Sequence, residues 1–120
     1  MPGTMCVSLT YAKDNTDKAT VAFVVANAAV ASDKDTVVFL STEGVRLAVQ
    51  GYAGDIHEEC FAPLAELMTN FAEAGGKIYV CSPCFKKRSL DETNLIDGAI
   101  IVGGAKLVEF LGEGSPCVSY

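Results

Sequence analysis

The chain has 120 residues, half of them hydrophobic, and a formal net charge of -6. This length suits one domain with a core of its own, so we treat residues 1–120 as a single domain. The hydrophobic content argues against disorder, and an acidic balance without tryptophan argues against a nucleic-acid partner. Five unevenly spaced cysteines favour reduced thiols over a disulfide framework.

Two features of the chain predict a cytoplasmic location and no membrane partner. Apolar runs such as Val21 to Ala31 are too short to span a bilayer. The first residues, Met1-Pro2-Gly3-Thr4, lack the charged and apolar regions of a signal peptide.

Strands and helices alternate along the chain. Apolar runs bounded by turn residues predict strands at 6–11, 36–40, 78–80, 99–102 and 117–120. Apolar periodicity and capping residues predict helices at 18–31, capped by Thr16 or Asp17, and at 45–49, 63–74, 90–96 and 105–111. Residues 52–61 are the least regular. The unbroken apolar second strand favours a parallel sheet. The right-handed crossover rule then gives a three-layer α/β/α sandwich with about five mostly parallel strands.

The stretch from Lys77 to Arg88 changes from a buried strand to a polar turn with two thiols. Pro83 ends the strand and suits the first turn of a following helix. Cys81 and Cys84 are therefore expected at the carboxyl end of a strand, where ligands and catalytic groups gather in open α/β sheets. Three cations follow in the sequence, Lys86, Lys87 and Arg88. Together with a helix amino terminus, they would favour the thiolate.

Three segments carry a resemblance to the DsrE/DsrF-like family: FLSTEGVRLA at 39–48, YVCSPCFKKRSL at 79–90 and LIDG at 95–98. The resemblance covers essentially the whole chain. It implies a three-layer α/β fold, a homotrimer or hexamer and, in sulfur-relay members, a cysteine that carries a persulfide between partner proteins. On the family's spacing Cys81 matches the active cysteine and Cys84 a second cysteine of small relatives. Ser89 stands where many relatives have glycine.

The first hypothesis is a persulfide carrier or sulfurtransferase-like protein with Cys81 as the nucleophile and Cys84 as the thiol that resolves or tunes it. It needs no cofactor, and its partners would be a sulfur donor and a sulfur acceptor. Whether the chain is itself an enzyme stays open. The apolar content also favours a symmetric homo-oligomer. By default the remaining thiols are structural, namely Cys6, Cys60 and Cys117.

Three other hypotheses stay open. The CxxC spacing with an internal proline suggests a thiol-disulfide oxidoreductase. His57 and Cys60 would complete a zinc-binding set with the two cysteines if their loops met, whereas the simpler interpretation is a mobile or oligomer-contacting loop. A non-enzymatic module would bind a small ligand at strand-end loops 11–15, 41–44, 81–84 and 103–104. Its pocket would be framed by Glu43, Gly44 and Arg46, which equally suit a helix start.

Overall fold

The computed structural model describes residues 3–120, which form a five-stranded sheet with helices around it. The strand order is β4-β3-β2-β1-β5, and every strand pair is parallel. The strands are β1 (Thr4–Leu9), β2 (Asp35–Leu40), β3 (Lys77–Cys81), β4 (Ala99–Val102) and β5 (Cys117–Ser119). The predicted α/β sandwich is confirmed, and its sheet is parallel throughout.

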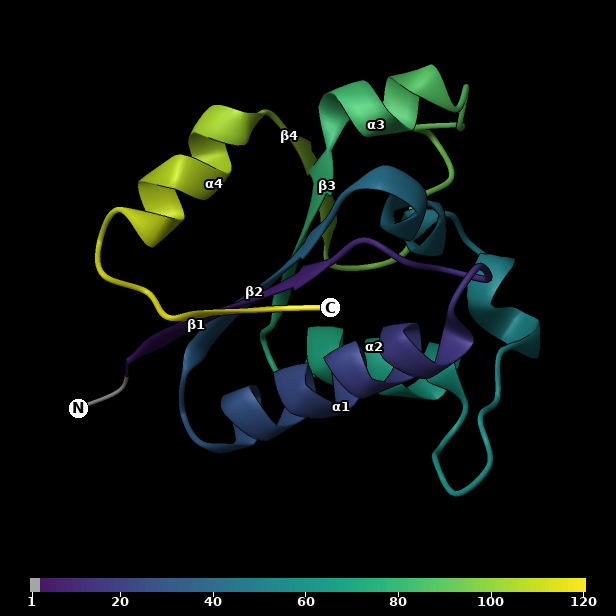
Figure 1. Cartoon of the computed structure of the whole chain (residues 1–120), viewed down its shortest axis with the longest axis horizontal. Coiled ribbons are helices and arrows are strands. Elements are labelled where there is room, and N and C mark those ends of the chain that lie inside the picture. Colours follow the sequence, from purple (N-terminus) through teal and green to yellow (C-terminus); the bar gives the residue numbers. More distant parts are fainter. Residues whose placement is uncertain (1–2) are drawn as a thin grey trace.

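Helices cover both faces of this sheet. They are α1 (Thr16–Ala31), α2 (Leu64–Glu73), α3 (Ser82–Lys87), α4 (Gly104–Leu111) and two 3-10 helices, η1 (Thr42–Ala48) and η2 (Tyr52–Asp55). In Figure 1, α1 and α2 lie side by side on one face, and α4 lies on the other. No helix within residues 3–120 is both long and apolar enough to cross a bilayer.

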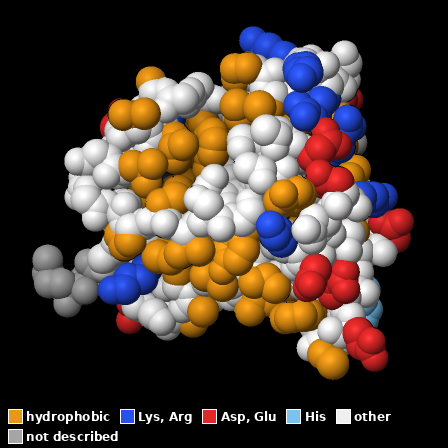
Figure 2. All heavy atoms as spheres, viewed as in Figure 1, with side chains coloured by type: hydrophobic (Ala, Val, Ile, Leu, Met, Phe, Trp, Pro, Cys, Tyr) orange, Lys and Arg blue, Asp and Glu red, His pale blue; other side chains and the backbone are white. Residues whose placement is uncertain are grey.

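The core follows from the two-residue period of the strands. On one face, alternate strand residues pack against α1 and α2, namely Val7, Leu9, Val38, Leu40, Ile78 and Val80. Within this layer the rings of Phe23 and Phe71 meet edge to face, with their centroids 5.9 Å apart. The intervening residues face α4: Cys6, Val37, Phe39 and Tyr79. The core between the sheet and α4 is smaller than the core between the sheet and the α1–α2 pair. It leaves Ile100 half exposed, and Figure 2 shows hydrophobic side chains at the surface beside α4.

Two helix starts differ from the sequence prediction. The cap of α1 is Asn15, whose Oδ1 accepts a hydrogen bond from the Lys18 N–H at 3.0 Å, so neither Thr16 nor Asp17 fills that role. The helix expected at 45–49 is η1, which begins earlier, at Thr42, and has 3-10 geometry.

The predicted helix at 90–96 is wrong. Asp91 Oδ1 accepts hydrogen bonds from the N–H and the hydroxyl of Thr93, at 2.9 and 2.6 Å, which closes a turn that competes with helix formation. The following residues pair instead with the end of η1. Leu95 forms an antiparallel bridge with Val49, and the Ile96 N–H donates to Ala48 O at 2.9 Å. The crossover from β3 to β4 therefore has one short helix and a long irregular segment.

Candidate functional site

The cysteine turn, which we define as Cys81 to Cys84, joins β3 to α3 at the carboxyl edge of the sheet. β3 ends at Cys81, and α3 begins at the next residue. Pro83 lies in the first helical turn, where its missing N–H costs no helical hydrogen bond. Cys81 and Cys84 are three residues apart across this start, so their side chains lie on one side of the turn. Both thiols are half-buried, which leaves them reachable from solvent.

The Cys81 thiol is a weaker acid than the sequence predicts. Burial is the largest cause and raises its pKa above the ordinary value, and the neighbouring Cys84 thiol raises it further. The backbone N–H of Cys84 and the charge of Arg88 lower this pKa, but they do not offset the burial. The expectation of a readily ionised thiol is therefore wrong in sign, although both predicted influences are present.

A charged cluster links α3 to η1 beside the two thiols. Glu43 accepts hydrogen bonds from Arg88 Nε at 2.6 Å and from Arg46 Nε at 2.8 Å, one on each carboxylate oxygen. Arg88 Nη1 also donates to the backbone oxygen of Cys84 at 3.1 Å. The Arg88 side chain is only 15% exposed. The structure thus brings together Cys81, Cys84, Arg88 and Glu43, which the sequence analysis selected from two distant segments.

The two lysines of the basic cluster lie elsewhere. Lys86 and Lys87 are exposed on α3, and neither forms an ion pair with any residue in the described part of the chain. Figure 2 shows the basic side chains gathered over α3, with acidic ones beside them. These lysines form part of the outer surface around the cysteine turn, and only Arg88 contributes to the charged cluster.

Gly44 has a packing role. A Cβ atom at this position would lie 2.4 Å from the carbonyl oxygen of Leu9, a backbone atom that has no room to move. The Gly44 N–H donates to Thr10 O at 3.2 Å and to Ser41 O at 2.9 Å. The missing side chain therefore lets η1 approach the end of β1, and this close approach positions Glu43.

The proposed zinc ligands do not form one set. His57 and Cys60 are both exposed, and His57 Nε2 is hydrogen-bonded with Phe61 O at 2.8 Å. Across residues 3–120 no three or more His, Cys, Asp or Glu side chains lie close enough to hold a metal ion together. The metal hypothesis therefore has no ligand set in the described chain.

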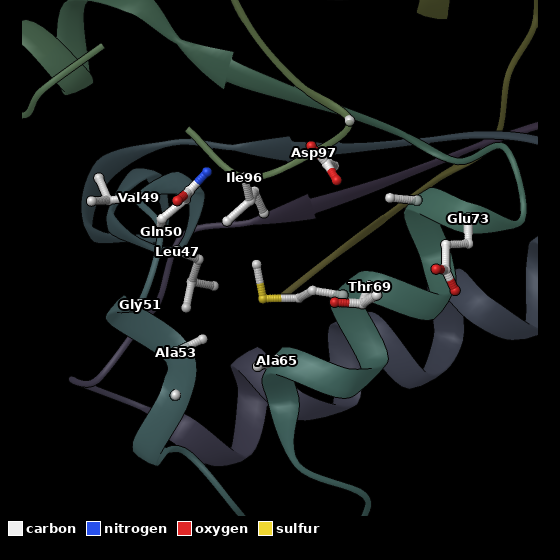
Figure 3. A pocket seen from close by; sticks show the side chains of 14 residues that line it. Leu47, Val49, Gln50, Gly51, Ala53, Ala65, Thr69, Glu73, Ile96 and Asp97 are labelled. Carbon is white, nitrogen blue, oxygen red and sulfur yellow. The ribbon is translucent and has the colours of Figure 1, made fainter. Parts of the chain in front are cut away.

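An open groove of about 500 Å³ lies between η1, η2, α2 and the segment before β4 (Figure 3). Its apolar lining includes Leu47, Ala53, Met68 and Ile96. Polar side chains lie around it, and they are Gln50, Thr69, Glu73 and Asp97. The groove has the size and mixed character of small-ligand sites. Its lining contains neither of the cysteines at the turn nor their charged neighbours.

Sequence reasoning missed this groove and placed a pocket at other loops. The cause is the crossover between β3 and β4. A full crossover helix would pack beside α2, whereas the irregular segment 89–98 leaves this position open. The Asp91-Glu92-Thr93 run was the signal available in the sequence, because Asp and Thr favour turns over helix interiors.

Comparisons with known proteins agree with this architecture. The sequence profile of the DsrE/DsrF-like family matches residues 5–119. The crystal structure of the ychN protein from E. coli superposes with a TM-score of 0.72 at 14% identity, covering 98% of this chain and 99% of that one. MTH1491 from Methanobacterium thermoautotrophicum, a protein of unknown function, superposes with a TM-score of 0.74 at 12% identity over the full length of both chains. At such identities these likenesses concern the fold alone.

Sequence relatives occur in Methanocaldococcus jannaschii. The uncharacterized protein MJ0760 is 29% identical over 99 residues, which is 82% of this chain and 36% of that protein. The uncharacterized protein MJ0989 is 38% identical over 55 residues, 46% of this chain and 48% of that protein. The chain thus spans between a third and a half of the curated relatives it matches. Because the family profile covers nearly every residue, the chain belongs to the DsrE/DsrF-like family.

Proposed function

We propose that this protein is a sulfur-relay carrier that holds sulfane sulfur as a persulfide on Cys81. The observation that carries the proposal is the position of this thiol in a DsrE/DsrF-like chain. It lies half-buried at the carboxyl end of β3, and Cys84 and Arg88 are both close enough to influence its ionisation. Ligands and catalytic groups gather at this edge of open parallel sheets, which supports a chemical role for the thiol.

The transfer needs no cofactor and no net oxidant. Cys81 would give up its proton, and its thiolate would attack the outer sulfur of a donor persulfide. A sulfur–sulfur bond forms to Cys81, the sulfur–sulfur bond of the donor breaks, and the donor leaves as a thiolate that takes up the proton. An acceptor thiolate then attacks the outer sulfur in the same way, and Cys81 is released and reprotonated.

The residues around Cys81 would have different roles in the transfer. Cys84 would tune Cys81 through its backbone N–H and its thiol, and Arg88 would supply positive charge to the thiolate and the persulfide anion. Glu43 would hold Arg88 in place. The exposed Lys86 and Lys87 would meet an acidic surface of a donor or acceptor protein. We propose a homotrimer or hexamer as the working unit, as in the family resemblance.

A second candidate function is the binding of a small ligand without catalysis. The groove beside α2 favours it, because its volume of about 500 Å³ and its largely apolar lining suit a small organic molecule. In that case the cysteine turn would be a structural feature. A CxxC thiol-disulfide oxidoreductase is a third candidate, supported by the interaction between the Cys81 and Cys84 thiols.

The test is intact-protein mass spectrometry after incubation with glutathione persulfide. Cys60 and Cys117 are exposed and would load without specificity, so the experiment uses a Cys60→Ser, Cys117→Ser background. We expect a gain of one sulfur atom that survives Cys84→Ser and disappears with Cys81→Ser. No gain in the background chain, while a known persulfide carrier loads beside it, would contradict the carrier function and favour the binding module.

A further inference from the structure

A second pair of cysteines lies away from the cysteine turn. Cys6 in β1 and Cys117 in β5 are direct register partners in the parallel ladder, followed by Val7 with Val118. Residues opposite each other in such a ladder point to the same face of the sheet. The Cys6 side chain is fully buried on the α4 side, whereas Cys117 is exposed at the sheet edge.

The spacing of these two residues fits a disulfide after a small movement. Neighbouring strands lie about 4.8 Å apart, inside the range of about 4.4–6.8 Å that separates the Cα atoms of bridged cysteines. The Cβ atoms of bridged cysteines lie closer, at about 3.8 Å, so the bond needs a local tilt of β5 that brings the two Cβ atoms about 1 Å closer without changing the spacing of the hydrogen-bonded strands. β5 has three residues and is an edge strand that pairs only with β1, so it can make this movement. The two thiols already interact, and together with burial this raises the pKa of Cys6 to about 12.

We propose that Cys6 and Cys117 are a redox-sensitive disulfide site that a low-molecular-weight disulfide, such as oxidised glutathione, converts into a bond between β1 and β5. This site does not depend on the proposed persulfide chemistry of Cys81.

Burial fixes the order of the two steps. The exposed Cys117 reacts first: it loses a proton, its thiolate attacks glutathione disulfide, and a mixed disulfide forms while one glutathione leaves as a thiol. Cys6 then loses its proton and attacks the Cys117 sulfur, which releases the second glutathione. In the balance, two protein thiols and one glutathione disulfide become one protein disulfide and two glutathione thiols. The high pKa of Cys6 makes the second step faster as the pH rises.

The bond would fix the carboxyl-terminal strand to the sheet. At present β5 is held by its ladder with β1 and by hydrogen bonds at both of its ends, among them that from the Tyr120 N–H to Ser8 O at 2.8 Å and that from the Cys6 N–H to Pro116 O at 2.9 Å. Because the disulfide would close nearly the whole chain into one loop, it would strongly restrict the unfolded state. We expect oxidation to raise Tm by about 5 °C or more.

The experiment treats a Cys81→Ser, Cys84→Ser chain with oxidised glutathione at pH 8.5 and maps its peptides by mass spectrometry. We expect a linked Cys6–Cys117 peptide that a reductant separates, together with the higher Tm. In a Cys6→Ala variant of this chain, Cys117 should instead retain one glutathione. If Cys6→Ala does not fold, the surface variant Cys117→Ser serves instead: the same treatment should leave its Tm unchanged, and a rise in Tm without Cys117 would overturn the proposal. Stable glutathione on Cys117 of the parent chain, with Cys6 still free, would overturn the proposal.

Discussion

Arg88 of α3 donates a hydrogen bond from Nε to Glu43 Oε2 of η1 at 2.6 Å, across 45 positions of sequence. The second oxygen of Glu43 is bonded by Arg46, and Arg88 also bonds the backbone oxygen of Cys84. One carboxylate thus connects the segment after β2 with the helix that carries the cysteine pair. The geometry of the cysteine turn therefore depends on a residue that lies outside it.

Removing the Arg88 charge should destabilise the fold. We expect Arg88→Met to lower the free energy of unfolding by about 1–2 kcal/mol, because its side chain is largely buried and Glu43 loses a charged hydrogen bond. The matched control Lys87→Met removes an exposed charge from the same helix and should change stability by less than about 0.5 kcal/mol. Urea unfolding measures both, and equal effects would contradict a special role for Arg88.

Gly44 should tolerate no side chain. In Gly44→Ala the new Cβ would meet Leu9 O at 2.4 Å, so η1 would have to move away from β1. We expect a loss of about 3 kcal/mol in urea unfolding. Gly54→Ala is the control, since nothing lies within 4 Å of its Cβ position, and it should stay within about 0.5 kcal/mol of the native chain. A neutral Gly44→Ala would show that the close approach of η1 to β1 is not needed.

The stabilising effect of Glu43 should depend on pH. Hydrogen bonds from Arg88 and then Arg46 hold the pKa of this carboxyl below its ordinary value of 4.5. A lowered pKa in the folded state adds stability that is fully present above the unfolded pKa and is lost as the pH falls through the folded one. We expect Glu43→Gln to be less stable than the native chain at pH 7, with the difference shrinking below pH 4.5. A difference that is constant with pH would exclude this charge effect.

Cys81 should react as a weakly acidic thiol. Burial raises its pKa, so its alkylation by iodoacetamide should have a midpoint at higher pH than in the same chain unfolded in urea. Peptide mass spectrometry separates Cys81 from the other cysteines. Arg88→Met should move the midpoint still higher, because the charge of Arg88 lowers this pKa. A native midpoint below that of the unfolded chain would show that the helix start outweighs burial.

Much of the fold could be predicted from local sequence. The apolar run at 36–40 indicated a strand buried on both faces, and β2 runs through the middle of the sheet. Pro83 after a β-branched run located the strand end at Cys81. The error at 90–96 had a local cause as well. The apolar Leu95 and Ile96 suggested a helical turn. The hydrogen bonds between Asp91 and Thr93 close a different turn, and the prediction did not take them into account.

The candidate site depended on contacts between distant segments. Sequence spacing selected Glu43 and Arg88 separately, but only the fold shows that they pair with each other. The sign of the Cys81 pKa shift was missed because it depends on burial against the core, which the sequence of the turn does not show. The groove beside α2 was missed because it arises from a helix that does not form.

The most direct test of the persulfide proposal is to locate the added sulfur in the native chain. The protein is loaded with glutathione persulfide, alkylated with iodoacetamide and digested, and each cysteine peptide is examined by mass spectrometry. We expect an alkylated persulfide on Cys81, even though Cys60 and Cys117 are more exposed. Extra sulfur confined to Cys60 or Cys117, with Cys81 alkylated as a simple thiol, would contradict it.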